Sequence, residues 1–304
     1  MTSLKGLLLV ALAALSWGTT GTTLKLIGAD GATAALLVGA IRMLVAAPAL
    51  VAVALIREGP LRISGRGFVL AGLCMAAYQV CYFSAVPLAG VAATALLAIC
   101  SAPIMIALLA YVLIGEALTL RRLLALGLGI CGAGLLLAGT GVGLGQGFGL
   151  GGLLALGAGF AYSLYAVTTK RSLAGTPPLG LSALTFSVAA LALLPLVAAR
   201  RSEALELAAR GTSQLLYLGL VATAAAYWLY AAALRSIPAG AAAVAGLLEP
   251  LTATLLGVIL FRERLGPAGF AGAALLLAAV LLLGLAGKGE PARASAGRIR
   301  ACSR

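Results

Sequence analysis

Ten stretches of about 20 or more apolar residues run along this chain, and they restrict its fold more than any other feature. A helix of that length crosses the hydrocarbon core of a lipid bilayer. Charged residues, or glycine and proline, separate the stretches. The first stretch is too long for the apolar core of a signal peptide, which is usually about 7–15 residues. We therefore expect ten membrane-spanning helices, at residues 4–26, 32–56, 67–86, 90–113, 120–139, 148–170, 178–199, 213–235, 239–261 and 266–287.

The composition excludes a soluble globular fold. Hydrophobic residues make up 62% of the 304 residues and charged residues only 10%, whereas a soluble domain carries about 25% charged residues. Because so few polar side chains cannot cover the surface of a soluble protein, we expect the apolar surface to face the lipid bilayer. The net charge of +13 would suggest a nucleic-acid partner in a soluble protein. Here the charges fall between the spans and in the tail, so we expect no nucleic-acid partner.

The lysine and arginine residues indicate the orientation. If the N-terminus is cytoplasmic, most of the basic residues outside the spans also fall on the cytoplasmic side. The positive-inside rule then places both termini in the cytoplasm, which agrees with an even number of spans. Residues 288–304 are polar and basic, and we expect them to form a disordered cytoplasmic tail.

An internal repeat divides the chain into two halves of five spans. Because five is an odd number, the second half must enter the membrane in the opposite sense, and such inverted repeats are typical of secondary transporters. We expect the first repeat at residues 1–143 and the second at residues 144–287. Lys25 and Lys170 each end the first span of their half. Their separation in the sequence is nearly that of four other matched pairs. These four are separated by 147 residues each: Pro48 and Pro195, Gly72 and Gly219, Pro103 and Pro250, and Glu116 and Glu263.

Each half also carries a proline in its fourth span, followed by an acidic motif and a last span rich in small residues. The motifs are Ala102-Pro103 with Gly115-Glu116-Ala117-Leu118, and Glu249-Pro250 with Arg262-Glu263-Arg264-Leu265. With this doubled pattern the chain resembles, over residues 4–287, the EamA-like family of the drug/metabolite transporter superfamily. Among its members it looks most like the YddG-type exporters of aromatic amino acids.

The resemblance implies an all-α integral membrane protein with ten helices around a central cavity. It also implies transport of a small molecule across the bacterial inner membrane without ATP hydrolysis. The chain contains no G-x-x-x-x-G-K-[ST] phosphate-binding motif. The motif residues Glu116 and Glu263 lie at helix ends, where we expect them to fix loop geometry against nearby arginines.

The candidate substrate-binding residues are mainly aromatic. Several of them are three or four residues apart and therefore share a helix face, and they fall on spans that are repeat partners. They could line a cavity that stacks an aromatic or apolar substrate. The alternative is a belt of aromatic side chains at the membrane interface, which fits poorly for Tyr78, Tyr82 and Tyr227 because they lie toward the middle of their spans. The aromatic candidates and one adjacent amide are Trp17, Tyr78, Gln79, Tyr82, Tyr162, Tyr165, Tyr227 and Trp228, with Tyr230 on the same span.

Two charged residues complete the candidate site. Arg42 lies well inside an apolar stretch and could bind a substrate carboxylate, or it could pair with a carbonyl group or reach toward the interface. Glu249 is the one carboxylate deep within an apolar run. Because burial disfavours the charged form of a carboxyl group, Glu249 could carry a proton or receive a substrate ammonium. Its alternative role is a structural hydrogen bond to a neighbouring helix.

Small residues in the fifth and tenth spans allow close helix packing, within one chain or between two. We expect a monomer. The four cysteines within the apolar stretches should pack as small apolar residues, without disulfides or metal ligation, and we expect no cofactor. The chain has no histidine, and its single aspartate, Asp30, lies in a loop, so an enzyme mechanism is not expected.

We therefore expect a secondary transporter that exports amino acids, aromatic or other neutral ones, by alternating access. The alternative is an exporter of drugs or other small metabolites on the same fold. The sequence leaves open the substrate and whether transport is coupled to protons.

Overall fold

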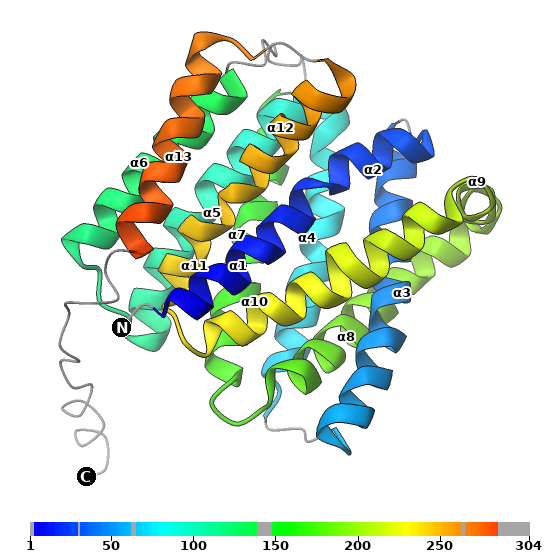
Figure 1. Ribbon diagram of the computed structural model, residues 1–304. Coiled ribbons are helices and arrows are strands. Elements are labelled where there is room, and N and C mark those ends of the chain that lie inside the picture. Colours follow the sequence, from blue (N-terminus) through cyan, green and yellow to red (C-terminus); the bar gives the residue numbers. More distant parts are fainter. Residues whose placement is uncertain (1–2, 30, 62–64, 139–147, 263–264, 285–304) are drawn as a thin grey trace.

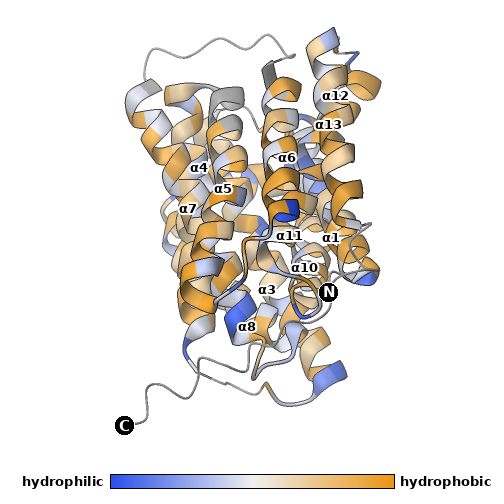
Figure 2. Cartoon of the chain, turned by 90° about the vertical axis from the view of Figure 1, so that its left-hand side faces the viewer, coloured by the Kyte–Doolittle hydropathy of each residue, from blue (hydrophilic) through white to orange (hydrophobic). Residues whose placement is uncertain are grey.

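The computed structural model describes residues 3–29, 31–61, 65–138, 148–262 and 265–284, and all regular structure in these residues is helical. Nine helical spans among them are long and apolar enough to cross a bilayer, and α6 (Leu120–Ala138) adds a tenth of 19 residues. The expectation of ten spans is therefore confirmed, and the helices form one bundle (Figure 1). Hydrophobic residues cover most of the length of the helices (Figure 2), as expected for surfaces that face lipid.

Seven of the ten spans are single continuous helices. Prolines inside four of them, such as Pro103, are tolerated because neighbouring helices can satisfy the freed backbone groups. These helices are α3 (Ala32–Glu58), α4 (Gly67–Ala89), α5 (Val91–Ile114), α6, α7 (Phe148–Ser172), α8 (Pro178–Ala199) and α13 (Pro267–Gly284).

The other three spans are interrupted, which the hydropathy pattern did not predict. Expected span 4–26 consists of α1 (Leu4–Gly18) and α2 (Thr20–Ile27), separated at Thr19. Expected span 239–261 consists of α11 (Ala239–Gly246) and α12 (Leu248–Phe261), separated at Leu247. The eighth span contains α9 (Arg201–Gly219), a π-helical segment η1 (Leu220–Ala225) and α10 (Ala226–Leu234).

Residues 201–210, which precede the expected eighth span, are also helical rather than a loop. Arg200 pairs with Glu203 at 2.9 Å and Arg210 with Glu206 at 3.5 Å, at the spacings that support a helix. The backbone of Gly211 is not helical (φ −136°, ψ 38°), so the helix bends there. Figure 1 shows the first part of α9 end-on, turned away from the direction of the span.

The packing between spans is symmetric when the two halves are exchanged. The third span packs on the sixth (α4 with α7), and the eighth packs on the first (α10 with α1). Likewise the fourth span packs on the sixth (α5 with α7), and the ninth packs on the first (α12 with α1). The second and seventh spans face each other (α3 with α8), as do the fifth and tenth (α6 with α13). This pattern is the one that two inverted repeats of five helices produce.

Some of the sequence expectations fall outside the described residues. These are the boundary of the repeats at residues 143 and 144, the motif residues Glu263 and Arg264, the loop residue Asp30 and the tail at residues 288–304. The repeat boundary stays a prediction.

The small residues of the fifth and tenth spans serve packing within the chain. A Cβ atom on Gly132 of α6 would lie 2.8 Å from the carbonyl oxygen of Gly272 on α13, and 2.8 Å from the backbone nitrogen of Leu276. A Cβ on Gly272 would lie 2.5 Å from the carbonyl oxygen of Gly132. Two backbones in such contact leave no room for a side chain between them.

This close approach predicts that Gly132→Ala destabilises the protein, by about 1–3 kcal/mol, because the added methyl group overpacks a backbone contact. Gly127→Ala on the same helix is the matched control, since nothing lies within 4 Å of a Cβ at that position. Thermal unfolding of both variants in detergent micelles measures the difference. Equal unfolding temperatures for the two variants would show that α6 and α13 do not pack as described.

Candidate binding site

The interruptions of the first and ninth spans lie against each other. A Cβ atom on Gly18, the last residue of α1, would lie 2.5 Å from the Cβ of Thr252 and 2.8 Å from the carbonyl oxygen of Glu249. The glycine therefore lets the end of α1 touch the first turns of α12. Interrupted helices that meet near the middle of a bundle are where many secondary transporters bind their substrates. This contact marks the candidate site.

Eight aromatic rings from five spans gather beside this contact. Trp17 lies next to Gly18, and its ring centroid is 4.8 Å from that of Tyr227 and 5.5 Å from that of Tyr230. Tyr78 connects Tyr82, at 5.8 Å, to Tyr162, at 5.7 Å. These separations are within the range of favourable aromatic pairs. We use the name aromatic cluster for Trp17, Tyr78, Tyr82, Tyr162, Tyr165, Phe186, Tyr227 and Tyr230. Phe83, whose ring centroid is 5.4 Å from that of Tyr82, is not counted in it.

The aromatic cluster has a buried side and a more accessible side. Trp17, Tyr165, Tyr227 and Tyr230 are at most 6% exposed, and Phe186 is fully buried. Tyr78, Tyr82 and Tyr162 are only partly buried. A ligand could therefore approach these three phenol rings while the other rings support them from behind.

Trp17 also offers a free hydrogen-bond donor. Its indole N–H is buried and has no partner among the described residues. Buried donors are normally hydrogen-bonded, so this unpaired N–H is an exception within the part of the chain that the structure describes.

Glu249 is the acidic residue of the site. It lies in the first turn of α12, where the helix dipole favours a negative charge, and its side chain is only partly buried. It is close enough to interact electrostatically with Arg42 and with the phenol groups of Tyr78 and Tyr82. The carboxylate thus lies beside the aromatic cluster.

Arg42 is the basic residue of the site. It is 6% exposed on α3. Gln79 on α4 is 1% exposed, and its amide oxygen, turned toward Arg42, accepts hydrogen bonds from Nη2 at 2.8 Å and from Nε at 3.1 Å. Arg42 therefore neither reaches toward the interface nor pairs with a carboxylate within the part of the chain that the structure describes.

The structure brings together nine of the ten residues that the sequence suggested for the site. The tenth, Trp228, is 41% exposed and has no ring contact with the aromatic cluster. The reason is helical geometry, because consecutive residues point about 100° apart, so the neighbour of the buried Tyr227 faces outward. Tyr230 takes its place, and its spacing of three from Tyr227 is the signal that could have selected it.

Phe186 is the member of the aromatic cluster that the sequence analysis missed altogether. Its ring centroid is 4.8 Å from that of Tyr227. No motif or spacing distinguishes it within the apolar seventh span, so only the packing of α8 on α10 reveals it.

The π-helical segment η1 ends immediately before the aromatic residues of α10. The hydroxyl of Thr223, within η1, donates to the carbonyl oxygen of Leu218 five residues earlier, at 2.7 Å. π-Helical turns occur mostly as insertions at functional sites, because they change which residues face the interior. Here the segment sets the direction in which Tyr227 and Tyr230 point.

A separate polar contact joins the two halves away from the aromatic cluster. The Lys170 ammonium donates to the carbonyl oxygens of Leu234 at 2.5 Å and Ile237 at 2.6 Å. Glu116 accepts a 2.9 Å hydrogen bond from the backbone N–H of Ala239, and lies 4.0 Å from Lys170. The expectation that Glu116 fixes loop geometry is thus confirmed, but its partners are a lysine and a helix N-terminus rather than arginines.

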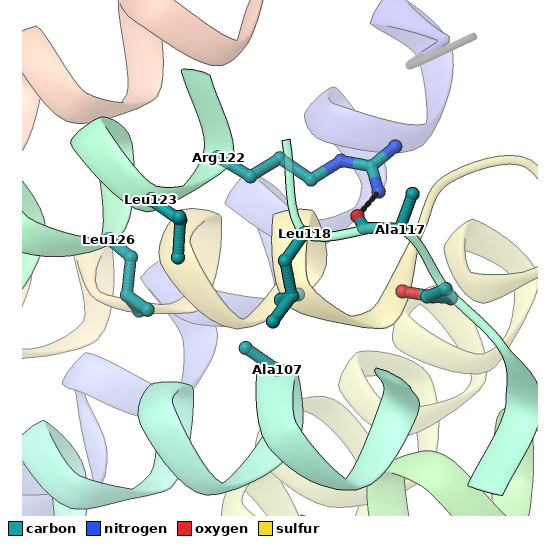
Figure 3. Close-up of a pocket in the computed structure, with 8 residues that line it drawn as sticks. Ala107, Ala117, Leu118, Arg122, Leu123 and Leu126 are labelled. Carbon is teal, nitrogen blue, oxygen red and sulfur yellow. Dashed lines mark hydrogen bonds between the residues drawn. The ribbon is translucent and has the colours of Figure 1, made fainter. Parts of the chain in front are cut away.

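Two cavities lie outside the aromatic cluster. The one in Figure 3, between the end of α5 and the start of α6, holds about 20 Å³, roughly one water molecule, and Arg122 donates to the carbonyl oxygen of Ala117 beside it. The other holds about 350 Å³, and Glu58 beside it accepts a hydrogen bond from the backbone N–H of Gly180 at 2.8 Å. Neither is lined by a residue of the aromatic cluster.

Comparison with known proteins places this arrangement in a family. Residues 4–138 and 149–285 each match the EamA-like transporter family. The "Uncharacterized transporter YwfM" of Bacillus subtilis is 37% identical over 281 residues, which cover 92% of this chain and 93% of that protein. An "Uncharacterized transporter" of Archaeoglobus fulgidus is 29% identical over 201 residues, which cover 66% of this chain and 70% of that protein.

A solved crystal structure shares this fold. It superimposes with a TM-score of 0.78 over 94% of this chain and 99% of its own, at 23% sequence identity. The two matched ranges and this likeness agree with a chain built from two repeats.

The contact between Lys170 and Glu116 predicts a measurable loss of stability in Lys170→Met. Removing the ammonium leaves two carbonyl oxygens without their donor and takes the nearby positive charge away from Glu116, which costs about 1–3 kcal/mol. Glu203→Gln, in the exposed pair with Arg200, is the control and should change stability by less than about 1 kcal/mol. Thermal unfolding in micelles compares them, and an unchanged Lys170→Met protein would contradict a stabilising role.

Proposed function

Because the chain belongs to the EamA-like transporter family, and so is a membrane transporter of small molecules, we propose that it exports neutral amino acids, aromatic ones included. We propose further that it acts as a secondary transporter by alternating access. Its transport role agrees with the names of its relatives.

The observation that carries the amino-acid proposal is a pair of opposite charges beside aromatic rings. Arg42 and Glu249 interact electrostatically, yet they form no ion pair within 4.0 Å in the described part of the chain. A free amino acid carries a carboxylate, which suits the arginine, and an ammonium, which suits the glutamate and the faces of tyrosine rings. Its side chain would pack on the partly buried tyrosines.

Alternating access is supported by the symmetry of the packing and by the position of the interrupted helices. Equivalent contacts in the two halves provide two similar arrangements, one opening toward each side of the membrane. The interruptions at Thr19 and Leu247 lie beside the candidate site, where a change in helix direction would alter access to it.

A second candidate function is export of drugs or other small metabolites. The size of the aromatic cluster favours it, since eight rings and one carboxylate would also suit a lipophilic cation. Such a substrate would leave Arg42 unused. Competition between amino acids and cationic dyes for transport separates the two proposals, because only the first predicts saturable inhibition by amino acids.

Glu249 is proposed to carry a proton in exchange for the substrate. In proteoliposomes, the wild type should then move a neutral amino acid faster when a pH gradient is imposed. Glu249→Gln should lose the response to the gradient but still exchange the amino acid, with a higher KM, since an amide oxygen still accepts from an ammonium. A mutant that follows the gradient like the wild type would refute the proton role, and no flux over a broad amino-acid panel would remove the substrate proposal.

The proposed location is the bacterial inner membrane with both termini in the cytoplasm. Green fluorescent protein fused after Arg304 should therefore fluoresce, because it folds in the cytoplasm, and alkaline phosphatase fused there should be inactive. Fusions after Arg210, on the opposite side in this topology, provide the control and should give the reverse result. Active alkaline phosphatase at the C-terminus would reverse the orientation.

A further inference from the structure

Gln79 holds Arg42 from one edge. Its amide oxygen accepts from Nε and Nη2 of the guanidinium, at 3.1 Å and 2.8 Å. A guanidinium has five N–H donors in a fixed plane, so this contact fixes the plane and uses two of the five donors. Both side chains are buried, at 1% and 6% exposure, so the contact is shielded from water.

The partner of Arg42 is neutral, and this has a chemical consequence. A carboxylate at position 79 would make the same two hydrogen bonds and would also cancel the charge of the guanidinium. The amide orients the guanidinium and leaves its positive charge in place. The acidic residue near it, Glu249, does not reach it within 4.0 Å among the described residues. A buried and unneutralised arginine favours the binding of an anionic group.

We propose that Gln79 is a specificity-determining positioning residue, which keeps Arg42 oriented and charged so that the site selects substrates with a carboxylate. Amines with the same side chain but no carboxylate are transported poorly, because they leave the arginine unpaired. This inference rests on the proposed function in amino-acid transport. It extends that function by assigning selectivity to a residue that acts through Arg42.

Gln79→Glu tests the inference with the substrate pair L-phenylalanine and phenethylamine, which share a ring and an ammonium and differ in the carboxylate. In wild-type proteoliposomes, phenylalanine should be the better substrate. In Gln79→Glu, the KM for phenylalanine should rise about 10- to 100-fold, the effect of losing a charged hydrogen-bonded contact. The KM for phenethylamine should stay the same or fall, so the preference narrows or reverses.

Gln214→Glu is the matched control. It makes the same chemical change on α9, where Gln214 accepts a hydrogen bond from Ser213, and should leave the ratio of the two KM values at the wild-type level. Gln79→Met is a second variant that removes the acceptor without adding charge, in case Gln79→Glu does not fold. It should raise the KM for phenylalanine and leave that for phenethylamine unchanged.

The outcomes separate the inference from the function on which it rests. If the wild type transports neither compound nor any other amino acid, the proposed function fails and the inference falls with it. If the wild type transports phenylalanine but the ratio of KM values is unchanged in the folded position-79 variants, the inference alone is overturned. A uniform loss of rate for both compounds would indicate a structural role and would also overturn it.

Discussion

The structure depends on one constraint, which is that a backbone inside a bilayer must satisfy its own hydrogen bonds. Continuous helices meet this constraint, and they make up most of the bundle. A helix can be interrupted only where other protein groups surround it. The interruptions at Thr19 and Leu247 are placed accordingly, since Gly18 brings one against the start of α12 and the other lies at that same start. Glu249 lies two residues beyond Leu247, so it is placed where the two interruptions meet.

The same absence of water inside the bilayer also limits where charged residues can lie. A charge within the hydrocarbon region is costly unless protein or a ligand compensates it. Gln79 compensates Arg42 in part through two hydrogen bonds, and Glu249 lies in the first turn of a helix beside the aromatic cluster. Two opposite charges that interact without touching are well suited to a molecule that carries both charges itself. The chain therefore combines a tightly packed scaffold, with contacts such as that between Gly132 and Gly272, and a polar centre. In that centre, protein groups compensate the charges of Arg42 and Glu249 only in part.

The sequence was sufficient to predict the helical scaffold because the patterns that indicate it are long. Ten apolar stretches predict ten spans, and a constant separation of 147 residues predicts the repeat, since both signals extend over most of the chain. The helix at residues 201–210 was missed because its support comes from ion pairs and from the burial of Ala204 and Leu207 rather than from hydropathy. Hydropathy alone does not show the interruptions, because an apolar stretch has the same hydropathy whether its helix is continuous or broken.

The candidate site was predictable in its residue types and less so in its contacts. Helical spacing grouped Tyr78 with Tyr82 and Tyr162 with Tyr165, and the structure keeps both pairs together. Trp228 and Tyr230 could not be told apart without knowing which face of α10 is buried. That Gln79 contacts Arg42 depends on the packing of α3 on α4, which no local pattern contains.

The central claim, that the aromatic cluster is the substrate-binding site, can be tested through Trp17 itself. The chain has two tryptophans, so Trp228→Phe leaves Trp17 as a single fluorescent reporter inside the cluster. Titration of this protein with L-phenylalanine should produce a saturable change in tryptophan emission, over the concentration range that saturates transport. Emission that stays constant while transport saturates would show that the substrate binds elsewhere.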